Sequence, residues 1–235
     1  MRDILLDQLL NDFYNSAFPG FTSKLTIGDP VLSTPVPVVD IPMHLDTDLL
    51  LEYAKQIELD PMQRTTYPYE QHPRFVGWNI QVLWSNDYNN TLLGDIYYKK
   101  TTAPVADKSA TGTSELIQQY LQALGLDCTI CMLSVFEPGA YLRPHRDIGL
   151  NSTPLNYFWL PLNNPIGSRL RVYPMGDIDI TLGHLYLLNQ ENFVHGAVNY
   201  SQEPRYVLVG HLNNISTEFE QQILNSILKQ YNQNI

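Results

Sequence analysis

Cysteine is scarce in this chain of 235 residues, and the two that occur, Cys128 and Cys131, stand three positions apart. Two cysteines provide no disulfide framework, which favours a reducing compartment. Long apolar runs are also missing, since no stretch approaches the ~20 residues of a membrane-spanning helix. No signal peptide is visible at the N-terminus. We therefore expect a cytoplasmic protein without a membrane partner.

Positive charge is the second shortage. The chain has 14 Lys and Arg residues against 24 Asp and Glu, a formal net charge of −10 at pH 7. Such a chain repels phosphates at long range, which argues against a nucleic-acid partner. Hydrophobic residues make up 44% of the sequence, enough for a sizeable core in one globular domain. Nothing in the sequence indicates an oligomeric state.

Apolar residues recur at helical spacing in the first half of the chain and near its end. The predicted helices cover residues 1–18, 46–60, 113–124 and 216–231. Prolines punctuate residues 28–46, which predicts a segment that wraps a surface or forms an edge strand. An aromatic and β-branched run predicts a strand over Phe75–Trp84, and residues 85–112 read as a long loop that could serve as a lid. From Cys128 onward, short apolar runs between Pro, Gly and Asn predict an antiparallel sandwich or barrel.

The segment SVFEPGAYLRPHRD, from Ser134 to Asp147, combines an apolar strand, a Pro138-Gly139 turn and a closing His-Arg-Asp. In extended backbone, residues i and i+2 point to the same side, so His145 and Asp147 can converge on one metal ion. The pair alone is weak evidence, because a random order of these residues would contain His-x-Asp about 0.4 times. A second copy, His44-Leu45-Asp46, precedes a helical period, and Asp46 is better explained there as a helix cap.

A metal site of two histidines and one carboxylate, which suits Fe(II) and leaves open positions for a co-substrate and oxygen, needs a third ligand from another strand. His184, His195 and His211 are the candidates. Arg205 opens an otherwise apolar strand ten residues after His195. If buried, it needs an anion, which a dicarboxylate co-substrate would supply. The alternative is an ordinary surface arginine at a strand edge.

These residues together resemble the aspartyl/asparaginyl β-hydroxylase type of Fe(II)/2-oxoglutarate-dependent oxygenase, which includes free-proline hydroxylases. The family signature S-V-x-x-P-G-x-x-x-x-P-H is matched by SVFEPGAYLRPH, from Ser134 to His145. A downstream pattern is matched at Gly183, His195, Asn199 and Arg205. The resemblance covers roughly residues 134–211 and implies an α+β fold with a double-stranded β-helix (jelly-roll, cupin-like) core. Since no linker is evident, we expect a single domain, 1–235, with helical or mixed N-terminal support and substrate loops (1–126), the core with the metal site (127–215) and a C-terminal helix (216–235).

The resemblance also implies roles for individual residues. His145, Asp147 and His195 would hold Fe(II), and Arg205 with Ser134 would bind the distal carboxylate of 2-oxoglutarate. The implied reaction consumes O2 and hydroxylates a C–H bond of an amino acid, free or in a peptide or protein, with release of succinate and CO2. Asp147 makes the site more similar to that of the proline hydroxylases, because the mammalian-type aspartyl hydroxylases lack the carboxylate ligand.

The strand after the metal pair departs from the family pattern. An R-L-H-x-P-L-like strand is expected, and YFWLPL places Tyr157 and Trp159 where Arg and His would stand. These two residues are candidates for substrate contact. Arg169 and Arg171 share one strand face and are further candidates, although a solvated face explains them equally simply. The substrate itself is left open.

Other residues have simpler explanations. Cys128 and Cys131, three apart in a strand, should point to opposite faces and read as core thiols. Trp78 and Trp84 could line a pocket but more often belong to a core. Two other functions fit less well: a non-catalytic jelly-roll module that binds a small molecule or a protein, and a metal-dependent isomerase or dioxygenase without 2-oxoglutarate, which would leave Arg205 and Ser134 unexplained.

Overall fold

A computed structural model describes residues 36–59, 75–86, 109–146, 157–190, 192–215 and 217–231. The predicted helix over 1–18, most of the predicted 85–112 loop and Asp147 lie outside these residues. The elements, in chain order, are β1 (Val38–Pro42), α2 (Thr47–Lys55), β2 (Phe75–Ser85), α4 (Thr113–Ala123), β3 (Leu126–His145), β4 (Tyr157–Pro161), β5 (Ser168–Val172), β6 (Gly176–Asp177), β7 (His184–Leu188), β8 (His195–Asn199), β9 (Arg205–Ile215) and α5 (Thr217–Tyr231).

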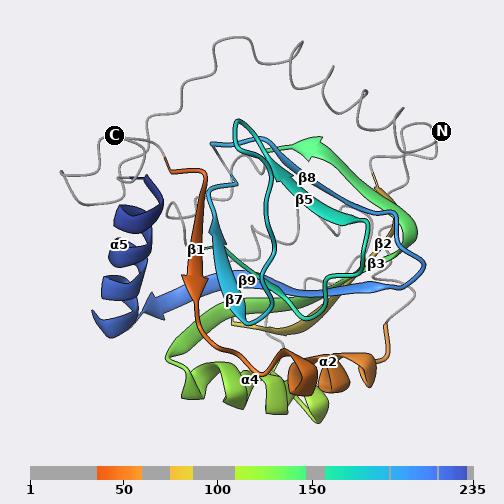
Figure 1. The fold of residues 1–235 in the computed structure, drawn as a ribbon. Helices are drawn as coiled ribbons and strands as arrows, with labels where there is room; N and C mark the ends of the chain where they lie inside the picture. The colour runs from red at the N-terminus through yellow and green to blue at the C-terminus, as the bar shows by residue number, and fades with distance from the viewer. Residues whose placement is uncertain are drawn as a thin grey trace.

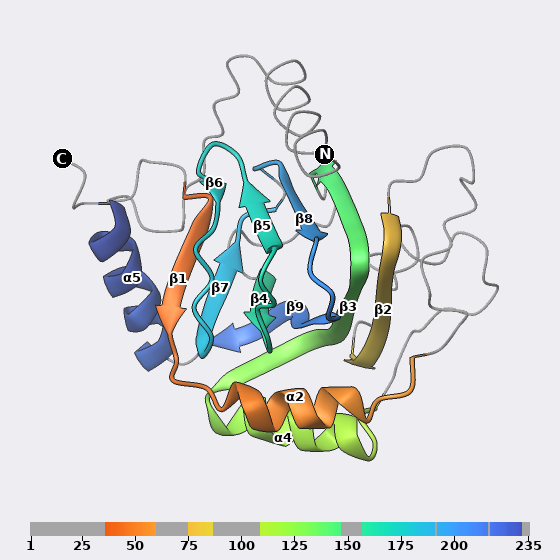
Figure 2. The same ribbon diagram turned by 45° about the vertical axis from the view of Figure 1, so that its right-hand side comes forward.

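The strands of the described residues form one antiparallel sheet of nine strands in the order β1-β7-β4-β9-β3-β8-β5-β6, with β2 also paired to β3. The sheet does not lie flat. Figures 1 and 2 show it curling, so that β5 and β8 face β4, β7 and β9 across an interior. This curled antiparallel sheet with few helices confirms the predicted α+β class with a jelly-roll core.

β3 makes the curl possible because it belongs to both halves of the sheet. Its first part, Leu126–Phe136, pairs with β9, and its last part, from Tyr141, pairs with β8. The predicted turn at Pro138-Gly139 is wrong, because both residues lie within β3, a continuous strand of 20 residues. Gly139 has a φ of +80°, a conformation that other residues rarely adopt. The dipeptide therefore bends a continuous strand from one half of the sheet to the other.

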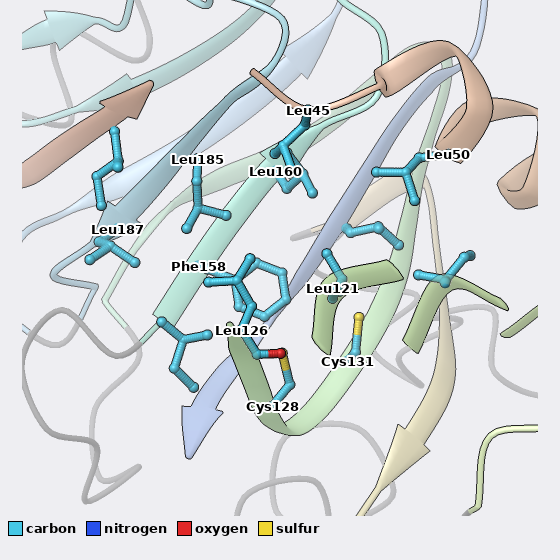
Figure 3. Close-up of a cluster of buried hydrophobic side chains, with 14 of the residues drawn as sticks. Leu45, Leu50, Leu121, Leu126, Cys128, Cys131, Phe158, Leu160, Leu185 and Leu187 are labelled. Carbon is cyan, nitrogen blue, oxygen red and sulfur yellow. The ribbon is translucent and has the colours of Figure 1, made fainter. Parts of the chain in front are cut away.

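The two faces of the curled sheet bury different sets of side chains. The outer face of the larger half packs against the helices in a cluster that includes Leu50, Leu121, Phe158 and Leu160 (Figure 3). α2 and α4 run along this side, and α5 lies beside β1 (Figure 1). The interior is lined by a second cluster, rich in aromatic and branched side chains: Trp78, Ile80, Met132, Phe136, Trp159, Leu170, Val172, Tyr186, Val207 and Val209.

Two local predictions in the N-terminal half are confirmed. β1, from the proline-punctuated segment, pairs only with β7 and is an edge strand of the described sheet. The Asp46 side chain accepts a hydrogen bond from the Leu49 backbone N–H at 3.0 Å and caps α2. In His44-Leu45-Asp46 the aspartate therefore has a structural role. Among the described helices, none is long and apolar enough to cross a membrane.

The cysteines are core thiols, as predicted, but not on opposite faces. Cys128 and Cys131 both lie in the cluster under the helices (Figure 3). The reason is a register shift between Cys128 and Ile130 in the pairing with β9. Such a bulge inserts one residue and changes the alternation of side chains. Burial raises the pKa of Cys128 to about 12, so this thiol stays protonated near neutral pH.

Candidate active site

Two histidines meet inside the sheet at the junction of β3 and β8. His145 ends β3, His195 begins β8, and the two residues are direct partners in the strand register. Their ring centroids lie 4.4 Å apart, with an angle of 47° between the rings. His195 is buried and His145 is half-buried. The fold therefore brings together two imidazoles that are 50 positions apart in sequence, which is the proximity a shared metal ion requires.

The orientation of His195 is set by the backbone just before it. Its Nδ1 lies 3.4 Å from the Phe193 carbonyl oxygen. A carbonyl only accepts hydrogen bonds, so Nδ1 is the donor in this contact, and Nε2 is the nitrogen that could bind a metal. Backbone carbonyls often hold metal-ligating histidines in this way. The predicted carboxylate ligand, Asp147, lies outside the described residues, and within the described residues no group of three His, Cys, Asp or Glu side chains could hold a metal.

Arg205 is buried in the interior without a matching anion among the described residues. Its side chain is 0% exposed, so it is not the surface arginine considered as the alternative. Nη1 donates to the Arg169 carbonyl oxygen at 2.9 Å, which ties β9 to the opposite strand β5. Nε and Nη2 have no hydrogen-bond partner in the described part of the chain. Burial lowers the pKa of Arg205 to about 9, because the charged form loses its hydration.

The free side of this guanidinium has the geometry that a carboxylate prefers. Nε–H and Nη2–H are parallel donors on one edge of the group, and carboxylates bind such an edge through both oxygens. The face of the guanidinium rests on Trp159, with Cζ 4.6 Å from the ring centroid. The Trp159 ring covers one face of the guanidinium, and the Arg169 carbonyl accepts from Nη1. The Nε–Nη2 edge is therefore the part that could bind an anion.

Ser134 is the next polar side chain on the interior face of β3. It is 3% exposed, and its Oγ accepts a hydrogen bond from Trp78 Nε1 at 2.6 Å. Ser134 pairs with Val207 and Phe136 pairs with Arg205, so Ser134 and Arg205 are diagonal neighbours on one face. Diagonal neighbours have Cα atoms about 7–8 Å apart, within reach of a long side chain. Ser134 and Arg205 therefore lie near each other on the interior face of adjacent strands.

Asn199 holds together the chain segments behind Arg205. It is 0% exposed, and its Nδ2 donates at 2.8 Å both to the Phe136 carbonyl and to the Glu203 carbonyl. Its Oδ1 accepts from the backbone N–H and the hydroxyl of Ser201. The asparagine that matched the family pattern is therefore a structural residue. It closes the β8–β9 connection against β3 and so sets where Arg205 enters the interior.

Comparison with known proteins shows which family the chain belongs to. The sequence profile described as aspartyl/asparaginyl β-hydroxylase matches residues 47–214. The chain belongs to this family. It is accordingly a 2-oxoglutarate-dependent hydroxylase. No curated protein sequence matches it.

Several solved structures are similar in shape to the hydroxylase. A prolyl-4-hydroxylase from Pseudomonas putida is 15% identical, with a TM-score of 0.49, and the match covers 90% of this chain and 100% of that one. A 2OG-Fe(II) family oxidoreductase from Burkholderia pseudomallei is 10% identical over 76% of this chain and 89% of that one, with a TM-score of 0.46. A Trichoplax adhaerens prolyl hydroxylase, solved with a hypoxia-inducible-factor peptide, is 14% identical over 94% and 92%, with a TM-score of 0.43.

The residues predicted to contact substrate in the hydroxylase divide between the two faces of the sheet. Tyr157 and Trp159 lie on the interior face of β4: Trp159 contacts Arg205, and Tyr157 meets His211 edge-on, with ring centroids 5.3 Å apart. His211, considered as a third ligand, therefore contacts Tyr157. His184, the other candidate, places Nδ1 2.7 Å from Asp40 Oδ1 on β1.

Arg169 and Arg171 lie on the outer face of β5, opposite to its buried residues Leu170 and Val172. Both bind Asp177 on the neighbouring strand, at 3.1 Å from Arg169 and 2.6 Å from Arg171. The structure thus brings neither guanidinium to the histidine pair. Only the backbone carbonyl of Arg169 reaches the interior, where it accepts from Arg205. Sequence reasoning missed this role, because every residue has a carbonyl and no side-chain pattern marks it.

The ion pairs of Asp177 predict a pH-dependent contribution to stability. Burial raises the pKa of Asp177, but hydrogen bonds and charge from Arg171 and Arg169 outweigh it and hold the pKa below its usual value. The contribution is therefore complete above the unfolded-state pKa of Asp and is lost as pH falls through the lower folded-state value. Partly exposed pairs of this kind contribute about 0.2–1 kcal/mol.

Asp177→Asn should accordingly lower the melting temperature by about 1–3 °C at pH 7 and by nothing measurable at a pH below the folded-state pKa. Thermal unfolding followed by circular dichroism across pH 2–7 checks this. A difference between the two proteins that persists unchanged at the acid end would contradict it. Metal and co-substrate binding should be unaffected, since the pair lies outside the interior.

Proposed function

We propose that this hydroxylase holds Fe(II) with His145, Asp147 and His195 and binds 2-oxoglutarate through Arg205 and Ser134. The observation that carries the proposal is the buried Arg205, whose Nε and Nη2 have no partner among the described residues. A buried cation without a counter-charge is costly, and a carboxylate on its free edge removes that cost. The paired histidines support the metal part, because imidazole is a ligand that suits transition metals.

The protein residues of this site bind and orient rather than react. Arg205 and Ser134 would fix one end of the co-substrate by donating hydrogen bonds to its distal carboxylate. The Phe193 carbonyl keeps His195 in the tautomer that ligates through Nε2. The apolar interior around the site, including Leu170, Val172 and Phe193, excludes water. When bound, Fe(II) would supply the oxygen chemistry, in which oxidative decarboxylation of 2-oxoglutarate to succinate and CO2 accompanies hydroxylation of the substrate C–H bond.

The substrate that we propose is an amino acid, free or within a peptide or protein. The family to which the chain belongs is described by its action on aspartyl and asparaginyl groups, which supports a substrate of this general class. We further propose that residues 1–235 form a single domain and that the protein acts in the cytoplasm, in keeping with its low cysteine content. Tyr157 and Trp159 remain the proposed substrate-side residues, because they face the interior beside Arg205 and His211.

A binding experiment and a turnover experiment test the proposal. Anaerobic addition of Fe(II) and 2-oxoglutarate to the protein should produce the visible metal-to-ligand charge-transfer absorption of a chelated 2-oxo acid. With oxygen admitted, succinate should form, faster when the correct amino acid or peptide is present. A screen across amino acids and peptides for succinate identifies the substrate class. A spectrum that does not change, with no succinate from any candidate, would instead favour the non-catalytic binding module.

A further inference from the structure

The position of Trp78 in the interior results from an irregularity in the pairing of β2 with β3, where Gly77 alone lies opposite residues 137–140. The pairing of β2 with β3 shifts register between Val76 and Trp78. Gly77, between them, has a φ of +65°, and a Cβ there would lie 3.2 Å from the Ala140 Cβ. A bulge of this kind re-aims the side chain that follows it. Trp78 thereby lies beside Phe136, with ring centroids 6.0 Å apart, and reaches Ser134 with its indole N–H.

Three strands place Trp78, Ser134 and Arg205 around one point of the interior. Trp78 and Arg205 are both register partners of Phe136, one from β2 and one from β9. Ser134 is two residues from Phe136 on the same face of β3 and is paired with Ile80 and Val207. The serine is therefore the diagonal neighbour of the tryptophan on one side and of the arginine on the other.

The direction of the Trp78–Ser134 hydrogen bond is unambiguous. An indole N–H only donates, so the serine Oγ must accept. At 2.6 Å the bond occupies one lone pair of the oxygen, which leaves the hydroxyl hydrogen to be donated elsewhere. Ser134 is 3% exposed, and a buried hydroxyl hydrogen requires an acceptor. Together with the Nε–Nη2 edge of Arg205, this makes a set of three donors.

We propose that Trp78 is a positioning residue for the co-substrate: by donating to Ser134, it orients the serine hydroxyl as a donor toward the carboxylate that Arg205 binds. The proposal rests on the proposed function of this site. It assigns a role to a tryptophan that, from the sequence, reads as a member of the core. Without the indole N–H, the hydroxyl rotates and accepts as readily as it donates, so the anion loses a preorganised partner.

Trp84 provides a matched control within the same strand. Its Nε1 donates to the Cys128 carbonyl oxygen at 3.4 Å, and its ring lies in the cluster under the helices. Replacement by phenylalanine removes one indole N–H and a similar volume from either position. Only Trp78, however, lies on the interior face with Ser134 and Arg205. An effect of Trp78→Phe that Trp84→Phe does not share is therefore specific to the carboxylate site.

The first test is the affinity for 2-oxoglutarate of the protein loaded with Mn(II), measured by isothermal titration. Trp78→Phe should raise the dissociation constant of 2-oxoglutarate about 3–10-fold, which is less than the loss of a whole hydrogen bond to a charged group would cause. The affinity for Mn(II) should not change. Trp84→Phe should change neither constant. Ser134→Ala should weaken 2-oxoglutarate binding at least as much as Trp78→Phe, and the double variant should bind no more weakly than Ser134→Ala alone.

Additive effects of the two substitutions, or an unchanged constant in Trp78→Phe, would overturn the positioning role while leaving the proposed function intact. Failure of the wild-type protein to bind 2-oxoglutarate would overturn both. If Trp78→Phe does not fold, the wild-type protein suffices. The chain has three tryptophans, and the indole N–H resonance of Trp78 should shift on addition of 2-oxoglutarate while that of Trp84 does not. A Trp78 resonance that stays in place would also overturn the role.

Discussion

Arg205→Met should strongly weaken the binding of 2-oxoglutarate without lowering the stability of the ligand-free protein. Removal of one partner from a buried charged pair costs about 2–5 kcal/mol of binding, so affinity should fall roughly 30-fold to several thousand-fold. The folded protein, in contrast, loses a cation that is 0% exposed and has two N–H groups without partners among the described residues. Replacing buried ionic groups by apolar side chains is often neutral, or stabilising by about 1–4 kcal/mol.

The sign of the stability effect follows from the pKa of Arg205. Burial lowers this pKa to about 9, so at pH 7 the folded protein carries the charge at a cost that the unfolded chain does not have. The cost is the lost hydration of the guanidinium, which the unfolded chain keeps. Methionine removes the cost and keeps most of the apolar stem that contacts Trp159.

Differential scanning fluorimetry with and without 2-oxoglutarate measures both effects at once. In the wild-type protein loaded with Mn(II), ligand at 100 times its dissociation constant stabilises by about 2.7 kcal/mol, which raises the melting temperature by roughly 5–10 °C. Arg205→Met should show no such increase, with a starting melting temperature equal to or above that of the wild type. Retention of the full ligand-induced increase would show that the carboxylate binds elsewhere.

His195→Ala should remove metal binding and, with it, turnover. Loss of a residue that only orients a ligand already costs about 10–100-fold in metal affinity, and loss of the ligand itself should cost more. The substitution also leaves the partner ring of His145 without its neighbour at 4.4 Å. We expect no saturable Fe(II) or Mn(II) binding at micromolar concentrations and no charge-transfer absorption with 2-oxoglutarate.

His184→Ala is the matched control, because His184 was a candidate for the same ligand position and its ring binds Asp40. This variant should keep metal affinity within about twofold of the wild type. It should also fold normally, because a partly exposed ion pair contributes little to stability. Equilibrium titration with Mn(II), followed by electron paramagnetic resonance, compares the three proteins. Equal loss in both variants would indicate a general loss of structure, and loss in His184→Ala alone would reassign the third ligand.

The sequence was informative where local chemistry suffices. The class of fold followed from the short apolar runs after Cys128, and the α2 cap followed from the position of Asp46 before a helical period. The candidate site followed from spacing and from the family signature, and the fold does bring His145 beside His195 and bury Arg205. Prediction failed in two places: β3 continues through Pro138-Gly139 instead of turning, and a bulge beside Cys128 changes the alternation that had assigned the cysteines to opposite faces.

Composition predicted an acidic globular protein, and the motifs carried a family resemblance that implied a jelly-roll hydroxylase and candidates for its metal and co-substrate sites. Only the folded chain shows what surrounds those candidates. Arg205 donates from Nη1 to the Arg169 carbonyl and rests its guanidinium face on the Trp159 ring. The Trp78 indole donates to Ser134. The physical reason is that these contacts join strands distant in sequence, and a bulge at Gly77 or a bend at Gly139 determines which side chains meet.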